Sequence, residues 1–265
     1  MRERPPEKEP GRNALSQQIK KVRAGEWGVK FYKIDRSMSG YILSIGGLRH
    51  LLDYVRQRGG SRVLDIGAGT TRGVAELAKS PLGRDLQFEA TVMSYHPVIE
   101  KNLGGDHTHV TAGETLRGVA DNSVDCIIAN HSIAYSIDPE RVVRSIDRIL
   151  KPGGVIKGIF GTGGKTDPKL KAKGYGPVTP FADALNKLGF AVALHEVQPD
   201  DDGNTSSIMI AIKPSGDIPR ASMIATARSL YESDDRDASA DAAQFRGDEP
   251  SVPVRGYGEL GEKSE

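Results

Sequence analysis

Asp65 is followed by two glycines in the stretch Val63-Leu64-Asp65-Ile66-Gly67-Ala68-Gly69-Thr70-Thr71-Arg72-Gly73. A carboxylate at the end of an apolar run can face the same ligand as the glycines that follow it. Glycine lets the backbone turn sharply and approach a ligand, because it has no Cβ. Backbone N–H groups at the start of the next helix favour an electron-rich or anionic ligand group. The stretch therefore predicts a buried strand, a tight turn and a helix start that bind a ligand together.

A nicotinamide-dinucleotide site would require two further features. It has a third glycine three residues after the second, where this chain has Arg72. It also has an acid about 20 residues further on, at the end of the second strand. The strand predicted there ends in Thr91-Val92-Met93-Ser94-Tyr95-His96, without an acid. The dinucleotide interpretation is therefore disfavoured.

Alternating strands and helices are predicted around the glycine turn. We expect strands near 63–66, 86–93, 108–111, 124–129 and 155–160, and helices at 74–79, 97–102 and 138–150. This alternation implies a parallel sheet with helices on both faces. A helix at 179–188 is followed by strands at 190–197 and 206–212. The residues between these two strands are too few for a crossover helix, so we expect an antiparallel hairpin.

The segments on either side of this region differ from it in character. Apolar residues spaced three or four apart predict one helix, capped by Ser39 and running to about Arg58. We divide the chain into a disordered N-terminus (1–12), a helical lid segment (13–61), a Rossmann-like domain (62–214) and an acidic, partly disordered tail (215–265). One further helix is expected in the tail, at 221–231.

Charge and composition argue against several classes of protein. The net charge is +1, although residues 1–62 carry 14 Lys/Arg against 6 Asp/Glu and residues 215–265 carry 6 against 11. We interpret both runs as solvated surface. The single cysteine, Cys126, excludes an intramolecular disulfide and lies in an apolar run typical of a buried residue. The sequence has no membrane-length apolar stretch, apolar signal core or His/Cys metal cluster, so it predicts a cytoplasmic protein without a metal.

Three motifs in order resemble the class I S-adenosylmethionine-dependent methyltransferases, particularly members that act on small molecules. They are Asp65-Ile66-Gly67-Ala68-Gly69, the run from Asp121 to Asn130, and Arg148-Ile149-Leu150-Lys151-Pro152-Gly153-Gly154. The resemblance extends from about Arg62 to Lys213, more than half of the chain. It implies an α/β fold: a doubly wound, seven-stranded, mostly parallel sheet with an antiparallel last strand, helices on both faces and an N-terminal helical lid. The implied cofactor is S-adenosylmethionine.

The resemblance also implies which residues meet the amino-acid end of that cofactor. Ligands of such a fold bind at the carboxyl ends of the strands. The backbone of Gly67, Ala68 and Gly69 would lie against the amino-acid part of S-adenosylmethionine. Asp65 would pair with its ammonium group, directly or through water, and Asn130 would offer a carbonyl oxygen to the same group.

Partners for the ribose and adenine depart from the family pattern. Ser94, Tyr95 and His96 lie where the family usually has a ribose-binding acid, and Gly113 and Glu114 lie in the loop that usually meets the adenine. Ala112 replaces the usual acid of that loop, and Thr71 stands where a third glycine is common. Each lost charge-assisted hydrogen bond is worth about 1.5–3 kcal/mol. Cofactor binding could therefore be weak, use other partners or be lost.

His131 is our first candidate for a catalytic base, because it directly follows Asn130 at the end of the fourth strand. Methylation of oxygen or nitrogen gains from a base that removes the proton of the acceptor. Tyr135 is a second catalytic candidate. Trp27, Tyr32 and Tyr41 are expected to form, with Tyr135, an aromatic lid that binds the substrate.

Three functions remain open. The first is an enzyme that methylates an oxygen, nitrogen or carbon atom of a small or medium-sized metabolite by in-line displacement. The second is an RNA or protein methyltransferase whose basic residues contact phosphates; these residues are Lys20, Lys21, Arg23, Lys30, Lys33 and Arg36, with a loop containing Lys165, Lys169, Lys171 and Lys173. The third is a non-catalytic accessory subunit. No membrane partner is expected, and the oligomeric state is open.

Overall fold

A seven-stranded sheet forms the centre of the computed structural model, which describes residues 37–93, 97–136, 138–161, 178–197, 206–216 and 218–232. The strand order is β3-β2-β1-β4-β5-β7-β6. The strands are β1 (Arg62–Ile66), β2 (Gln87–Val92), β3 (Thr108–Val110), β4 (Val124–Asn130), β5 (Leu150–Gly161), β6 (Ala191–Val197) and β7 (Ser206–Ile212). Strands β1 to β5 pair in parallel, whereas β7 runs antiparallel to both β5 and β6. The predicted parallel sheet and closing hairpin are confirmed.

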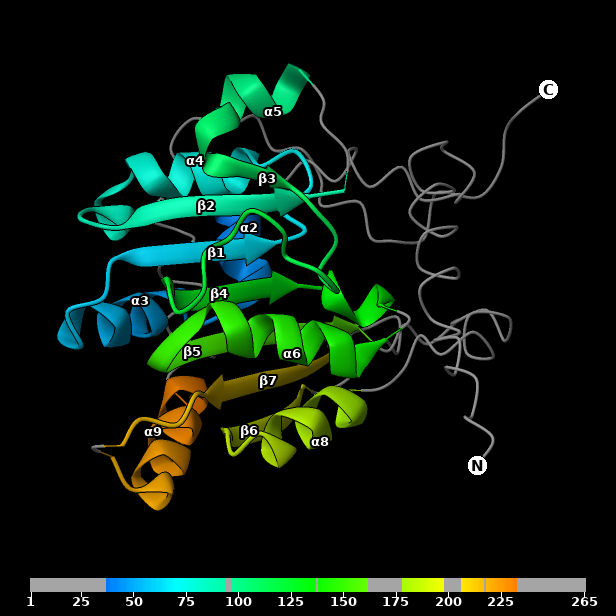
Figure 1. Ribbon diagram of the computed structural model, residues 1–265. Helices are drawn as coiled ribbons and strands as arrows, with labels where there is room; N and C mark the ends of the chain where they lie inside the picture. The colour runs from blue at the N-terminus through cyan, green and yellow to red at the C-terminus, as the bar shows by residue number, and fades with distance from the viewer. Residues whose placement is uncertain are drawn as a thin grey trace, which may run out of the picture.

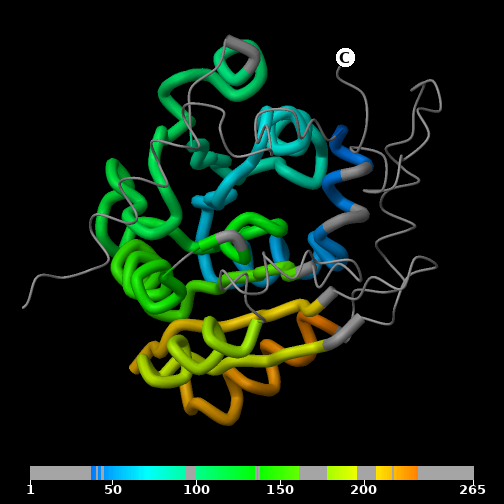
Figure 2. The backbone as a smooth tube through the Cα atoms, turned by 90° about the vertical axis from the view of Figure 1, so that its right-hand side faces the viewer, coloured from blue at the N-terminus to red at the C-terminus, as the bar shows by residue number. Residues whose placement is uncertain are grey.

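Helices cover both faces of the sheet (Figures 1 and 2). One face is covered by α2 (Met38–Ile45), α3 (Leu48–Gln57), α4 (Arg72–Lys79) and α9 (Arg220–Glu232). The other is covered by α6 (Pro139–Ile149) and α8 (Thr179–Lys187). The short segments α5 (Pro97–Asn102), η2 (Pro81–Gly83), η3 (Gly105–His107) and η4 (Ile133–Tyr135) complete the described elements. The predicted doubly wound α/β class is therefore correct.

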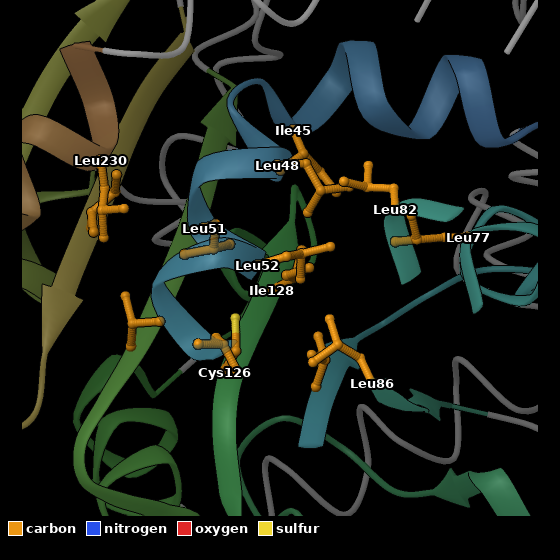
Figure 3. Close-up of a cluster of buried hydrophobic side chains, with 14 of the residues drawn as sticks. Ile45, Leu48, Leu51, Leu52, Leu77, Leu82, Leu86, Cys126, Ile128 and Leu230 are labelled. Carbon is orange, nitrogen blue, oxygen red and sulfur yellow. The ribbon is translucent and has the colours of Figure 1, made fainter. Parts of the chain in front are cut away.

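The strand β4 is continuously apolar in sequence because both of its faces are buried. Cys126 and Ile128 belong to the core layer under α3, which Figure 3 shows, whereas Ile127 and Ala129 belong to the layer under α6. All four side chains are fully buried. Burial raises the pKa of the Cys126 thiol well above its usual range, which makes this cysteine a poor nucleophile.

One helix predicted before the glycine turn is in fact two. Helix α2 ends at Ile45 and α3 begins at Leu48, and Gly46 and Gly47 between them have φ angles of 66° and 39°. A left-handed backbone breaks an α-helix, and glycine adopts it at little cost. The predicted apolar stripe still reaches the core, since Ile42, Ile45, Leu48, Leu52 and Val55 are all buried. Ser39 lies inside α2, so the prediction that it caps the helix was wrong.

A buried lysine explains where the helix breaks. Lys157 lies in β5, an interior strand, with no exposed surface, and its Nζ donates to the carbonyl oxygen of Gly46 at 2.9 Å. In a continuous helix that carbonyl would accept the amide of residue 50. The break turns it toward the sheet instead, and a buried ammonium gains an acceptor.

Of the two boundaries predicted for α6, the start is confirmed and the region after its end was predicted wrongly. Asp138 caps α6, since its Oδ1 accepts from the amide of Arg141 at 2.9 Å, as the Asp-Pro pair predicts. The residues between the predicted helix (138–150) and the predicted strand (155–160) are instead part of β5, which begins at Leu150. A register shift against β4, between Val124 and Cys126, accommodates them.

An ion-pair network joins β1, β2 and β3. Glu89 accepts from Nη2 of Arg62 at 2.8 Å and contacts Nε2 of His109 at 2.7 Å, and only 12% of its side chain is exposed. Burial alone would raise the pKa of Glu89, but the hydrogen bonds from His109 and Arg62 outweigh it and lower the pKa to about 2. The network holds together the edge of the sheet that carries β3.

We expect Gly46→Ala to destabilise the protein by about 1 kcal/mol, because an alanine Cβ is strained in the left-handed backbone conformation at this position. In a continuous helix the same change would stabilise by a similar amount. Urea denaturation of the wild-type protein and of Gly46→Ala shows whether the free energy of unfolding falls or rises. The control is Gly216→Ala, where an added Cβ meets open space and no such change is expected.

We expect Glu89→Gln to lower the free energy of unfolding at pH 7 by about 3 kcal/mol, the value that corresponds to the lowered pKa. The carboxylate stabilises the fold above the pKa of an unfolded glutamate, about 4.3, and this contribution is lost as the pH falls toward 2. The difference in free energy of unfolding between wild type and Glu89→Gln, measured by denaturation, should therefore be smaller at pH 3 than at pH 7.

Glu140→Gln is the matched control, since its pair with Arg144 spans 3.5 Å and both side chains are more than 60% exposed. Such a surface pair should contribute less than about 0.5 kcal/mol. A loss of stability for Glu89→Gln that is as small as this, or that does not change with pH, would contradict the stabilising role given to the Glu89 carboxylate.

Candidate functional site

The carboxyl ends of β1, β2 and β4 meet at one edge of the sheet (Figure 1). The glycine turn follows β1 at this edge, with φ angles of 75° at Gly67 and 59° at Gly69. A Cβ added to Gly67 would lie 2.5 Å from the Cβ of Ser132, so no larger residue fits. The turn after β1 thus lies directly against the segment that follows β4, as the alternating fold requires.

Thr91, near the end of β2, forms hydrogen bonds with the glycine turn. The amides of Gly67 and Ala68 donate to the Thr91 carbonyl at 3.0 and 3.1 Å, and the Gly67 amide also lies 3.0 Å from Thr91 Oγ1. Further along, Nδ2 of Asn102 donates to the carbonyl of Thr70 at 2.7 Å. These hydrogen bonds hold the shape of the turn, and the contact of its backbone with a ligand stays a prediction.

Asp65 and Asn130 lie on neighbouring strands at the same edge. Asp65 pairs with Ile128 across β1 and β4, and Asn130 lies two residues further along the same face. Their exposed fractions are 2% and 6%. The two residues thus bring a buried carboxylate and a buried amide to the carboxyl ends of neighbouring strands, and a buried carboxylate requires a hydrogen-bonding or cationic partner.

His131 adopts a left-handed backbone, with φ at 57°. Its amide donates to the carbonyl of Ile159 on β5 at 2.9 Å, which holds this conformation in place. Such strain in a residue other than glycine costs of order 1 kcal/mol and is concentrated at functional sites. The predicted catalytic candidate thus lies at the carboxyl edge, directly after Asn130.

Gly113 and Glu114 also reach this edge. A Cβ on Gly113 would lie 3.6 Å from Ile66 and 3.9 Å from Ile133, so the loop lies between the ends of β1 and η4. The carboxylate of Glu114 is buried and accepts from Oγ of Ser136 at 2.6 Å. In this structure the carboxylate therefore joins its own loop to the segment that leads into α6.

Tyr41 does not lie where an open aromatic lid would place it. It is 4% exposed, packs in the core and donates from its hydroxyl to Oδ2 of Asp65 at 2.8 Å. The lid expectation failed here because an apolar ring on the inner face of α2 is buried against the sheet. Trp27, Tyr32, Ser94, Tyr95, His96 and the side chain of Tyr135 lie outside the described residues, so their roles stay predictions.

Two further residues at this edge were not predicted as site residues: Ser132, and Thr71, which the sequence showed only as a replacement for a common glycine. Thr71 has a φ of 62° and Ser132 faces Gly67. Their buried hydroxyls meet no hydrogen-bond partner among the residues described here. A buried polar atom without a partner suits a polar ligand. The only sequence signal for them was their place within two residues of Gly69 and of His131, which alone is too weak to identify a site residue.

Two kinds of feature are absent from the described part of the chain. No three His, Cys, Asp or Glu side chains gather around a common point there. None of the helices described is both long enough and apolar enough to span a membrane.

Comparison with known proteins identifies the central part of the chain. Residues 64–157 match the family model described as a methyltransferase domain. A ubiquinone/menaquinone biosynthesis C-methyltransferase from Yersinia enterocolitica is 30% identical over 113 residues, 40% of this chain and 45% of that protein. A ribosomal protein L11 methyltransferase from Streptococcus mutans is 34% identical over 147 residues, 50% of this chain and 43% of that protein. The chain thus spans less than half the length of these curated relatives.

Among solved structures, the chain is similar to a phosphoethanolamine N-methyltransferase from Haemonchus contortus bound to S-adenosylhomocysteine. The TM-score is 0.49 with 18% identity, over 62% of this chain and 52% of that one. The matched residues 64–157 contain β1, the glycine turn, Asp65, Asn130 and His131, all at one edge of the sheet. Residues 64–157 are thus identified as a methyltransferase domain.

Proposed function

We propose that the protein transfers the methyl group of S-adenosylmethionine to an oxygen, nitrogen or carbon atom of a small or medium-sized metabolite. One observation carries the proposal. A buried carboxylate, Asp65, lies one residue before the end of β1, next to a glycine turn in which a Cβ on Gly67 would clash with Ser132. This arrangement suits a ligand that brings an ammonium group close to backbone.

The described residues fit the amino-acid end of that cofactor. Asp65 supplies a negative charge in a nearly dry environment, where attraction to an ammonium is stronger than in water. Asn130 offers an amide oxygen from the next strand. The buried hydroxyls of Thr71 and Ser132 are further polar groups available to the ligand. We assign the ribose to Ser94 and Tyr95 and the adenine to Gly113 and Glu114, following the family pattern.

Methyl transfer makes modest demands on the protein. The bound cofactor supplies an electrophilic methyl group on a sulfonium centre. The protein must hold the acceptor in line with it, which can contribute several kcal/mol of the barrier. We assign to His131, held at the edge by its backbone contact with Ile159, the removal of a proton from the acceptor. Tyr135, in η4, is the second candidate for contact with the acceptor.

A metabolite is the preferred acceptor class. The name of the Yersinia relative describes a C-methyltransferase of quinone biosynthesis, which supports a small organic acceptor. The name of the Streptococcus relative describes a methyltransferase of a ribosomal protein, so a macromolecular acceptor is the second candidate. The basic segment and lysine loop that would serve it lie outside the described residues. A non-catalytic accessory subunit is the third candidate.

The first test is calorimetric titration with S-adenosylmethionine. We expect the wild-type protein to bind it and Asp65→Asn to bind at least tenfold more weakly, because the neutral amide loses its attraction to the ammonium. Asp138→Asn is the matched control, since asparagine caps a helix as well as aspartate does and this position lies at α6. A wild-type protein that produces no heat would favour the non-catalytic alternative.

The second test uses S-adenosylmethionine with a labelled methyl group, incubated with separated small-molecule, RNA and protein fractions of a cell extract. We expect label in the small-molecule fraction, and a rate about 100-fold lower for His131→Gln at unchanged cofactor affinity. His107→Gln, an exposed histidine in η3, is the control. Label confined to RNA or protein would replace the metabolite by a macromolecule.

A further inference from the structure

We propose that Tyr41 is a positioning residue for the cofactor, which acts by orienting the carboxylate of Asp65 toward the ammonium group. The inference rests on the proposed function, because it presupposes that Asp65 receives that ammonium. It assigns to the N-terminal helix α2 a part in cofactor binding that neither the glycine turn nor the matched domain, which begins at residue 64, contains.

The contact itself is short and buried. The Tyr41 hydroxyl donates to Oδ2 of Asp65 at 2.8 Å, and the two residues are 4% and 2% exposed. A hydrogen bond to a charged oxygen is among the strong ones in proteins, and a low dielectric strengthens it further. Holding one carboxylate oxygen fixes the plane of the group, so the direction of the other oxygen is set before a ligand arrives.

Three contacts hold α2, and through it Tyr41, in place. At the start of the helix, the amide of Met38 donates to Oε2 of Glu76 on α4 at 2.7 Å. At its end, Lys157 holds the carbonyl of Gly46 at 2.9 Å. Between them, Ile42 and Ile45 are buried in the core. The tyrosine is therefore presented by a helix that is fixed at both ends.

The bonds of α2 to Asp65 and to Glu76 lead to the two elements that flank the glycine turn. Asp65 lies near the end of the strand before the turn, and Glu76 belongs to the helix that begins directly after it. Glu76 is itself held by Nε of Arg72, in the first turn of α4, at 2.7 Å. Helix α2 thus joins the strand and the helix on either side of the turn, and a shift of α2 would move the carboxylate relative to the turn.

The test compares two ligands that differ mainly at the amino-acid end. S-adenosylhomocysteine and 5′-methylthioadenosine share the adenosine and an uncharged thioether, but only the first has the ammonium and carboxylate. The ratio of their affinities, measured by calorimetry on the full chain, reports the contribution of that end alone. We expect Tyr41→Phe to lower this ratio about tenfold, the usual weight of one hydrogen bond to a charged group.

Tyr54→Phe is the matched control. Tyr54 lies on α3 and donates to the carbonyl of Gly153 at 2.9 Å, so the same atom and one hydrogen bond are removed away from the glycine turn. We expect it to leave the ratio unchanged. Asp65→Asn should lower the ratio, and Tyr41→Phe should lower it no further in that background, because the tyrosine acts through the carboxylate.

The outcomes separate the inference from the function on which it rests. Equal weakening of both ligands by Tyr41→Phe would mean that Tyr41 supports only the fold. Tighter binding of S-adenosylhomocysteine would mean that the tyrosine competes with the ammonium. Either result overturns the inference and leaves the proposed function standing. A wild-type protein that binds neither ligand would overturn both.

Discussion

A lysine buried in the middle of the sheet constrains the whole N-terminal side of this protein. Lys157 is fully buried in β5, and a buried ammonium is very costly unless oxygen atoms surround it. The carbonyl of Gly46 is one such oxygen, and it is available because the chain leaves helical geometry at Gly46 and Gly47. This contact sets the place of α2, and α2 in turn carries Tyr41 to Asp65.

The two faces of the sheet consequently differ in chemistry. Asp65, Ile128 and Lys157 form one row across β1, β4 and β5, on the face that α2 and α3 cover. Both charges act on the neighbouring Cys126, whose pKa burial raises most, Asp65 raises further and Lys157 lowers. The opposite face, under α6 and α8, is an apolar layer. The protein thus concentrates buried charge where the proposed cofactor site begins and keeps the other face for packing.

Around the site, the backbone is held by contacts that come from several strands. Thr91 on β2 holds the amides of the glycine turn, and Ile159 on β5 holds the amide of His131. The two residues with left-handed backbones are held in the same way, His131 by Ile159 and Thr71 by the carbonyl of Ala68, which accepts from the Thr71 amide at 2.9 Å. A site with its geometry fixed in this way needs little rearrangement to receive a ligand, which favours both affinity and precise alignment.

The sequence by itself determined the alternation of strands and helices, the closing hairpin, the Asp138 cap and the glycine turn with Asp65 before it. These features depend on local patterns: apolar runs, spacing of three or four, and glycine, proline or aspartate at element ends. It also placed Asn130 and His131 at the end of β4, because a strand end follows directly from the end of an apolar run.

Only the tertiary structure decided the partners of these residues. The break at Gly46 depends on Lys157, which is 111 residues away, and the role of Tyr41 depends on Asp65, 24 residues away. The network of Glu89 joins three strands, and the extension of β5 back to Leu150 depends on its pairing with β4. Sequence spacing carries no information on such contacts, because they arise only when the sheet brings distant residues to one face and leaves buried charges to find acceptors.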